Sequence, residues 1–225
     1  MRKTTKFLAA FWAILFLIPA TEALAQRRRG LVDISPRSER HGLWFTIGAA
    51  AGADNYHYEN GPGWNGVIGA NGRREDQYAP TITLALGGTP NPHLRLGGEI
   101  DAWVWRYTDT TGVGYNYDVT ESLVQALLVG QYYPATNLGL FLKGGLGFSR
   151  TGTDTYGASA GSYESGFGYL VGAGYEIRLG RRIFLTPAVT VMQHRSDAGG
   201  SLDEQGTLHE RVVTFGVGLT VQPGR

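Results

Sequence analysis

The stretch LRLGGEIDAWVWRY, residues 94–107, decides between two classes of β-protein. Apolar and charged side chains take opposite sides of it, with Leu94, Leu96, Ile100, Ala102 and Val104 on one side and Arg95, Glu99 and Asp101 on the other. A period of two predicts a β-strand whose two faces meet different surroundings. The apolar face packs on a core if the charges meet water, and it contacts lipid if the charges point into a closed barrel.

Composition narrows the possible functions. The 225 residues, with 34 Gly, 12 Tyr and no Cys, suffice for one sizeable core or one closed barrel. The formal charge is +1 and the basic residues are scattered, so we expect no nucleic-acid partner. A chain without Cys has no disulfide, thiolate metal site or lipidated cysteine, and its histidines lack metal-ligand spacing. We therefore expect no metal ion and no cofactor.

The N-terminal segment is typical of a secretory signal peptide. A basic start precedes the apolar stretch FLAAFWAILFLIPA, residues 7–20, which is short for a membrane-spanning helix. The sequence Ala-Leu-Ala at 23–25 fits the cleavage rule, so we expect the mature chain to begin at Gln26. The alternative is a retained N-terminal anchor. The expected organisation is a signal peptide at 1–25, a flexible periplasmic lead-in at 26–41 and a folded domain at 42–222.

Eight strand-like runs follow, starting near residues 43, 80, 94, 119, 138, 167, 183 and 212. Three connections are tight turns rich in Pro, Asn and Gly, namely TPNPH at 89–93, PATN at 134–137 and LGRR at 179–182. The other four are long and polar, roughly 59–79, 109–118, 154–166 and 196–210. Short turns alternating with long loops predict an all-β, eight-stranded, antiparallel, up-and-down transmembrane β-barrel.

The two faces of these runs differ in residue size. In residues 213–221, for example, Val, Phe and Leu alternate with Thr and Gly. Gly weakens a water-facing strand but fits the crowded interior of an eight-stranded barrel, so the small face is predicted to be inside. Buried charges persist when they are paired. We expect an interior ion-pair network that fills the barrel, formed by Arg95, Glu99, Asp101, Glu121, Lys143, Glu176 and Arg178. A solvated polar face is the alternative.

Two tryptophans leave a question open. Trp103 and Trp105 fall on the interior side by the same alternation. Either a β-bulge turns them into an outer aromatic girdle, or they line the mouth of the barrel. The sequence does not decide between these positions.

Three stretches carry a resemblance to a known family, namely FLKGGLGFSR at 141–150, GYLVGAGYEIRLGRRIFLTPAV at 168–189 and VVTFGVGLTV at 212–221. Their spacing of glycines and aromatics resembles that of the bacterial outer-membrane β-barrel domain family, the small OmpA/OmpX/OmpW-like barrels. The resemblance implies a Gram-negative outer-membrane protein that is inserted by the barrel-assembly machinery. We expect a monomer with a filled interior, no open pore and a structural or surface-interaction role. The four outer loops would contact a partner that the sequence does not identify.

The stretch QHRSDAGG, residues 193–200, supports an alternative function. It is similar to the His-x-Ser-Asn-x-Gly stretch of outer-membrane lipid A 3-O-deacylases, with Asp197 in place of the Asn. The resemblance implies His194 as the base and Ser196 as the nucleophile, and Glu210 on the neighbouring run could orient the histidine. However, the alternation directs His194 and Ser196 inward, away from lipid. A polar strand end that leads into an exposed loop explains the same residues, and we favour a protein that is not an enzyme.

Four arginines lie on the apolar face, each at the loop end of its run: Arg106, Arg150, Arg195 and Arg211. An arginine at the bilayer midplane costs about 2–4 kcal/mol, so arginines are expected near the membrane surface. The planar guanidinium pairs well with phosphate. We expect these four residues to bind lipopolysaccharide phosphates, and interface arginines without a specific lipid are the alternative. A third hypothesis for the whole chain is a soluble periplasmic barrel that binds a small apolar ligand.

Overall fold

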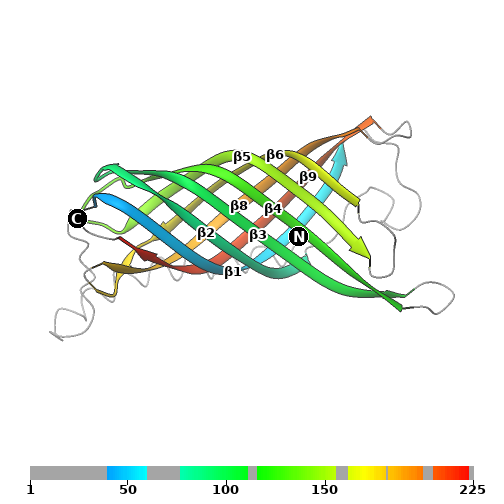
Figure 1. Cartoon of the computed structure of the whole chain (residues 1–225), viewed down its shortest axis with the longest axis horizontal. Helices are drawn as coiled ribbons and strands as arrows, with labels where there is room; N and C mark the ends of the chain where they lie inside the picture. Colours follow the sequence, from blue (N-terminus) through cyan, green and yellow to red (C-terminus); the bar gives the residue numbers. More distant parts are fainter. Residues whose placement is uncertain are drawn as a thin grey trace, which may run out of the picture. The chain divides into compact units, whose positions relative to one another are not determined.

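The computed structural model describes residues 40–59, 77–110, 116–155, 162–180, 182–199 and 205–222 (Figure 1). These residues form β-strands and the short connections between them. In the described ranges, no helix is long and apolar enough to cross a membrane. The expected signal peptide at 1–25 lies outside the described residues, as does the lead-in up to residue 39.

The wall of the molecule is built from nine strand segments, which are β1 (Gly42–Glu59), β2 (Gln77–Asn91), β3 (Leu94–Thr110), β4 (Asn116–Tyr132), β5 (Leu140–Thr155), β6 (Ser162–Tyr175), β7 (Ile177–Arg178), β8 (Ile183–Gly199) and β9 (Gln205–Val221). Segments β6 and β7 flank Glu176 and both pair with β8. They therefore form one interrupted strand, and the wall has eight strands.

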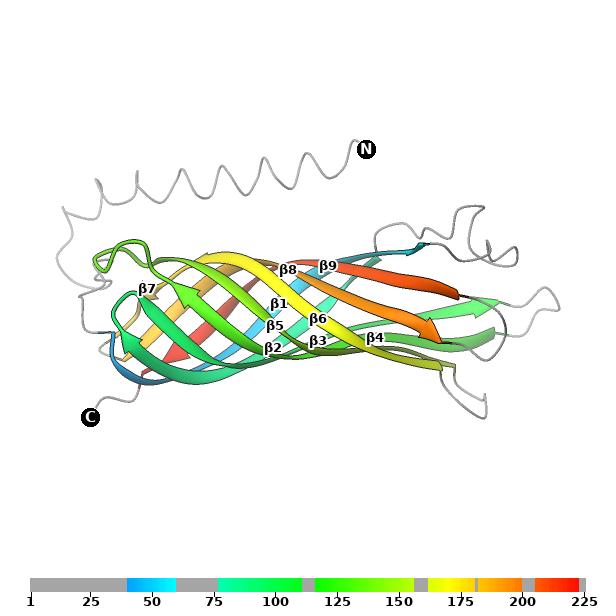
Figure 2. The same ribbon diagram turned by 90° about the horizontal axis from the view of Figure 1, so that it is seen from above.

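The sheet closes on itself. Strands that follow one another in the chain pair antiparallel, and β1 pairs with β9 from Phe45↔Val221 to Glu59↔Thr207. The first strand is thus joined to the last, which confirms the predicted closed, eight-stranded, antiparallel barrel. Figures 1 and 2 show the strands running obliquely to the long axis of the barrel, as closure of a sheet requires.

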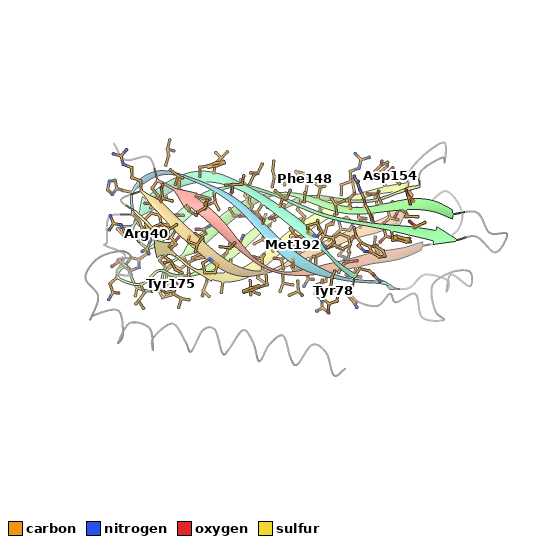
Figure 3. The ribbon with its side chains drawn as sticks, turned by 90° about the horizontal axis from the view of Figure 1, so that it is seen from below. Arg40, Tyr78, Phe148, Asp154, Tyr175 and Met192 are labelled. Atoms are coloured by element: carbon orange, nitrogen blue, oxygen red, sulfur yellow. The ribbon has the colours of Figure 1, made fainter. Side chains whose placement is uncertain are left out.

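The large apolar face of the wall points outward. Leu128 is 74% exposed and Phe148 is 81% exposed, whereas Met192 on the opposite face is 1% exposed. Figure 3 shows Phe148 outside the ribbon and Met192 within it. On β9 the outward residues from Val213 to Val221 form an unbroken apolar row. Eight residue steps of about 3.4 Å at a tilt of about 40° span roughly 20 Å, close to the apolar band of a membrane barrel.

The stretch 94–107 takes the orientation of a barrel wall. Glu99 and Asp101 are buried inside, whereas Leu96 and Ile100 are about half exposed on the outside. Because successive side chains of a strand point to opposite faces, this one assignment fixes the direction of every side chain along β3.

The short connections share one end of the barrel, here called the turn end. They are residues 92–93, 133–139 and 179–182, which match the three predicted turns. At the opposite end, here called the loop end, several strands begin earlier than the sequence predicted. The starts of β2, β4, β6 and β9 are Gln77, Asn116, Ser162 and Gln205 instead of residues near 80, 119, 167 and 212. The apolar alternation stops where the outside becomes polar, but the backbone pairing continues beyond that point.

Candidate functional site

A cluster of charged and aromatic side chains closes the turn end. Glu176 forms an ion pair with Arg95 and a second with Arg40, whose Nε lies 3.2 Å from Glu176 Oε2. Arg40 also donates to the carbonyls of Thr136 and Leu138 and lies 3.9 Å from the centre of the Tyr133 ring. This cluster of Arg40, Arg95, Tyr133 and Glu176 is called the turn-end seal. Figure 3 shows Arg40 at this end of the barrel.

The side chains of the turn-end seal are buried and in contact with one another. Arg40, Arg95, Tyr133 and Glu176 are each at most 3% exposed. The Tyr133 hydroxyl contacts Arg95 Nη1 at 2.7 Å and Glu176 Oε1 at 3.1 Å. Burial raises the pKa of the Tyr133 phenol, and the negative charge of Glu176 raises it further. Tyr133 lies in the connection after β4, so its neutral phenol is part of the turn-end seal and not of a strand.

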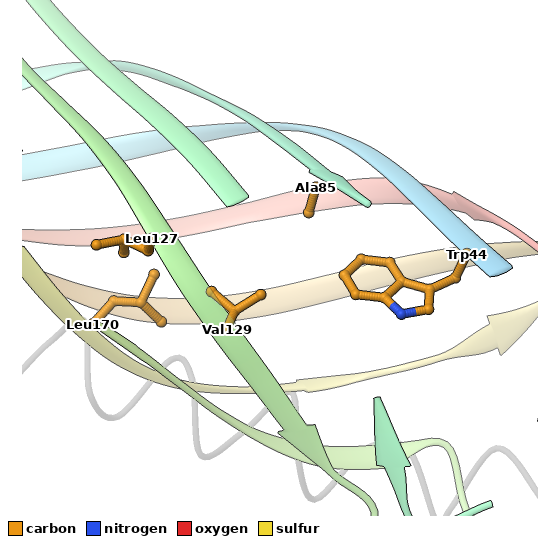
Figure 4. Packing of buried hydrophobic residues seen from close by; sticks show 5 residues of the cluster. All are labelled: Trp44, Ala85, Leu127, Val129 and Leu170. Atoms are coloured by element: carbon orange, nitrogen blue, oxygen red, sulfur yellow. The ribbon is translucent and has the colours of Figure 1, made fainter. Parts of the chain in front are cut away.

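A second ion pair lies deeper in the barrel. Lys143 Nζ on β5 lies 2.6 Å from Glu99 Oε1 on β3, and the glutamate is buried while the lysine is partly buried. Asp101, two residues along β3, accepts a hydrogen bond from Thr83. These groups lie close to an apolar cluster of Trp44, Ala85, Leu127, Val129 and Leu170 (Figure 4). The opposite wall, rich in Thr and Gly, leaves a cavity of about 60 Å³.

The two tryptophans whose orientation the sequence left undecided lie on the inside of the barrel. Trp103 is fully buried and packs with Ala79, Leu123, Met192 and Val212, with Trp105 partly buried against this cluster. The Trp103 Nε1 donates to the Gly52 carbonyl at 3.3 Å, and a Cβ on Gly52 would lie 2.7 Å from the Trp103 ring. The absence of a side chain at Gly52 therefore makes room for the indole.

The histidine that the sequence singled out has an unexpected partner. His194 Nδ1 lies 2.6 Å from Ser149 Oγ on β5, and both residues are buried. Ser196 instead donates to Glu164 Oε2 at 2.8 Å. Glu210 is the register partner of His194 on β9. The structure thus brings His194, Ser196 and Glu210 to one inner region, but the described hydrogen bonds do not link them as a base, a nucleophile and an acid.

Carboxylates gather near the loop end of the interior. A cavity of about 110 Å³ is lined by Asp54, Glu121, Glu164 and Glu210 together with Thr and Ser side chains. Glu121, expected in the interior ion-pair network, accepts a hydrogen bond from Tyr107 at 3.2 Å in this upper region. The expected network is therefore divided along the barrel into the turn-end seal, the Lys143–Glu99 pair and this acidic cavity.

Arg178 differs from the other residues of the expected network. It pairs with Phe184 at the turn end, and its Nε donates to the Gly180 carbonyl at 2.9 Å in an exposed position. The strand is interrupted just before it, at Glu176, whose N–H donates to the Gly139 carbonyl. The hydrogen bond described for Arg178 therefore holds the turn between β7 and β8.

All four arginines of the apolar face are exposed on the outer wall: Arg106, Arg150, Arg195 and Arg211. They lie on β3, β5, β8 and β9, toward the loop end of each strand. The outward residues on their turn-end side are apolar or small for most of each strand, so these guanidiniums mark the outer border of the apolar band.

A closed barrel with an apolar exterior and a charged interior is the architecture of an outer-membrane protein, and a comparison with protein families gives the same result. A family model described as "Outer membrane protein beta-barrel domain" matches residues 16–220. The chain belongs to this family. Membership in the outer membrane protein beta-barrel domain family indicates the bacterial outer membrane and confirms the predicted family. A comparison with curated protein sequences finds no match.

Several solved structures of bacterial barrels are similar to this chain. They include Ail, the attachment invasion locus protein of Yersinia pestis, with 12% identity, a TM-score of 0.48 and coverage of 80% of this chain and 99% of that chain. OprG from Pseudomonas aeruginosa has 17% identity, a TM-score of 0.47 and coverage of 82% and 98%. Neisserial surface protein A has 10% identity, a TM-score of 0.48 and coverage of 80% and 97%. At these values the likeness carries no argument about ligands or activity.

Sequence reasoning missed three residues of the interior. The sequence places Arg40 in the polar lead-in, gives no role to Tyr133, and includes Ser149 in a stretch of the family resemblance without assigning it a contact. A buried tyrosine beside two arginines has no local signature, because its partners come from distant parts of the chain. The contact between Ser149 and His194 depends on the registers of β5 and β8 with β6, the strand that lies between them.

Proposed function

We propose that the protein is a monomeric barrel of the bacterial outer membrane with a filled interior and a structural or surface-interaction role, exported by a signal peptide at 1–25. The observation that carries this proposal is the two-sided wall. Large apolar side chains are exposed around the barrel, while Arg95, Glu99 and Glu176 are buried inside it. Such an extensive apolar surface is unfavourable in water and suits contact with lipid. This arrangement favours a membrane barrel over a soluble carrier.

The packing of the interior supports a barrel without an open pore. The turn-end seal, the Trp44 cluster and the Trp103 cluster occupy the lumen at successive positions. The cavities of about 60 and 110 Å³ have room for a few water molecules each. Eight strands enclose just enough space for side chains, so a static channel is not expected.

The loop end supports a role at the cell surface. Beyond the arginines, the strands continue with exposed polar residues such as Thr108, Asp118 and Asp154. Figure 3 shows Asp154 near this end of the barrel. A wall that extends past the apolar band would hold the four outer loops above the membrane, where they can contact a partner.

The outward arginines support contact with lipopolysaccharide. Guanidinium groups bind phosphate oxygens through two parallel N–H donors. With the loop end at the cell exterior, four such groups at the outer border of the apolar band lie at the height of phosphorylated headgroups.

The hydrolase alternative receives little support from the described contacts. A serine hydrolase needs its nucleophile within hydrogen-bond reach of its base. Ser196 is bonded to Glu164, and His194 is 1% exposed and faces the lumen. An acyl chain in the membrane would have to cross the wall to reach it. We infer that the protein does not deacylate lipid A.

The first experiment combines localisation with a lipid A mass spectrum. The chain with its signal peptide is expressed in a Gram-negative host beside a His194→Ala variant, and heat-modifiable gel mobility reports insertion. We expect both proteins in the outer-membrane fraction, unchanged lipid A and no steady conductance in planar bilayers. Loss of an acyl chain with the native protein but not the variant would overturn the non-enzymatic proposal. Recovery in the soluble periplasmic fraction, without detergent dependence, would overturn the membrane proposal.

A further inference from the structure

The four outward arginines are not equivalent. Arg195 on β8 is the register partner of His209 on β9, and Arg211 on β9 is the partner of Gln193 on β8. The two arginines therefore occupy diagonal positions on one face of neighbouring strands. Diagonal positions lie about 7–8 Å apart, within reach of long side chains. Both guanidiniums can thus approach a single ligand.

The other two arginines each have an acid close by. Arg106 pairs with Thr120, and Asp118 lies two residues further along the same face of β4, where it accepts a hydrogen bond from Thr108. The Arg150 guanidinium lies 4.3 Å from the centre of the Tyr163 ring, and the Tyr163 hydroxyl donates to Asp154. A carboxylate thus offsets part of the positive charge at both positions.

Arg195 and Arg211 differ from these two arginines because each has a second guanidinium as a diagonal neighbour on the next strand. Among the side chains that the structure describes on β6, β8, β9 and β1, no Asp or Glu faces outward, and the side chain of Asp197, two residues beyond Arg195 on β8, is outside the described part. Within the same described part, neither guanidinium has a hydrogen-bond or ion-pair partner in the protein. Two neighbouring guanidiniums are complementary to a group with two negative charges.

Neighbouring side chains place a polar donor beside the two arginines and an apolar surface on their turn-end side. The Tyr169 hydroxyl donates to Gln193 Oε1, which orients the Gln193 amide on the outer wall beside Arg211. Toward the turn end lie the exposed side chains of Val213 and Phe215, and Phe167 and Tyr169 flank the pair on β6. A ligand here would meet charge above and hydrocarbon below, which is the profile of a lipid with an anionic headgroup.

We propose that Arg195 and Arg211, with the Gln193 amide, form a binding site for one phosphate group of a phosphorylated lipid headgroup in the outer leaflet. This inference rests on the proposed lipid contact and deepens it, because it assigns the affinity to one side of the barrel. Two forked guanidiniums supply enough N–H donors to engage a phosphate dianion from both sides. Arg106 and Arg150 act as border residues with a smaller contribution.

The test uses the full mature chain in nanodiscs made with phosphatidylcholine and a small fraction of bis-phosphorylated lipid A. Native mass spectrometry counts the lipid A molecules that remain bound as the protein is released. Two double variants remove the same charge, R195Q/R211Q from the pair and R106Q/R150Q as the matched control. Lipid A without phosphates and added inorganic phosphate form the other arms.

The expected result is a loss of at least tenfold in retained lipid A for R195Q/R211Q and less than threefold for R106Q/R150Q. Dephosphorylated lipid A should be retained weakly by all proteins, and millimolar inorganic phosphate should not displace the intact lipid. Equal losses in the two double variants would overturn the paired site while leaving lipid contact by the four arginines intact. Full retention by a variant with all four arginines replaced by Gln would overturn both. Displacement by inorganic phosphate would show a free-anion site rather than a lipid site.

Discussion

Ser149 Oγ on β5 lies 2.6 Å from His194 Nδ1 on β8, and the two side chains are buried together in the lumen. His194 Nε2 has no hydrogen-bond partner among the described residues. The described hydrogen bond of the histidine is therefore made with a serine two strands away along the wall, although the sequence suggested Ser196 on its own strand. Only β6 lies between the two strands, and its Gly166 and Gly168 leave room for the serine and the histidine to meet on the inner face of the wall.

Replacing Ser149 by Ala should destabilise the barrel by about 1–3 kcal/mol, because it leaves the buried imidazole without its described partner. The measurement is equilibrium unfolding in urea in lipid vesicles. Ser196→Ala is the comparison at the residue suggested by the hydrolase hypothesis, and S149A/H194L, which removes both polar groups, should recover part of the loss. An unchanged unfolding midpoint for Ser149→Ala would contradict the role of this contact.

Replacing Lys143 by Met should cost about 3–5 kcal/mol, since it leaves Glu99 buried without its cation. Asp101 is a second carboxylate close to Lys143, and it would also lose the favourable interaction with the lysine charge. The double variant E99Q/K143M should be more stable than Lys143→Met alone, because no uncompensated charge remains. Urea unfolding of the three proteins forms the test. If the double variant is less stable than the single one, the ion pair does not govern the stability of this layer.

Tyr133 predicts a dependence of stability on alkaline pH. Burial and the charge of Glu176 raise the pKa of its phenol in the folded state above the usual value of about 10. The folded protein therefore holds this proton more tightly than the unfolded chain does. The resulting stability is present below pH 10 and is lost as the pH rises toward the folded-state value.

Tyr133→Phe should reduce that loss. The free energy of unfolding, measured between pH 9 and 11.5, should fall less steeply for the variant than for the native protein. Tyr132→Phe, which changes an exposed tyrosine next to it in the chain, is the matched control and should keep the native slope. Equal slopes for all three proteins would contradict the assignment of this titration to the turn-end seal.

Much of the wall was predictable because strand alternation is a local property. Leu96 and Glu99 reveal their faces through their own neighbours, and the glycines opposite Val213 and Phe215 indicate the crowded side. The turns were predictable for the same reason, since Pro, Asn and Gly act within a few residues.

The contacts inside the lumen were not predictable in the same way. Arg40 joins Glu176 across 136 residues, and Ser149 joins His194 across 45. Such pairs depend on the register between strands and on the closure of the barrel, and neither appears in a period of two. The diagonal position of Arg195 and Arg211 also required the register of β8 with β9.

If the apolar face contacts lipid, the cost of an outward arginine should depend on its depth in the membrane. Leu128 lies on β4, opposite Leu146 on β5, and is 74% exposed near the middle of the outward apolar row. An arginine at this position would lie near the bilayer midplane and should destabilise the barrel by about 2–4 kcal/mol in urea unfolding with lipid vesicles. Ser122 points to the same side of the same strand, closer to the loop end, so Ser122→Arg should cost no more than about 1 kcal/mol. In a soluble barrel both arginines would face water and the two costs would be equally small, so equal unfolding free energies for the two variants would contradict the assignment of this face to lipid.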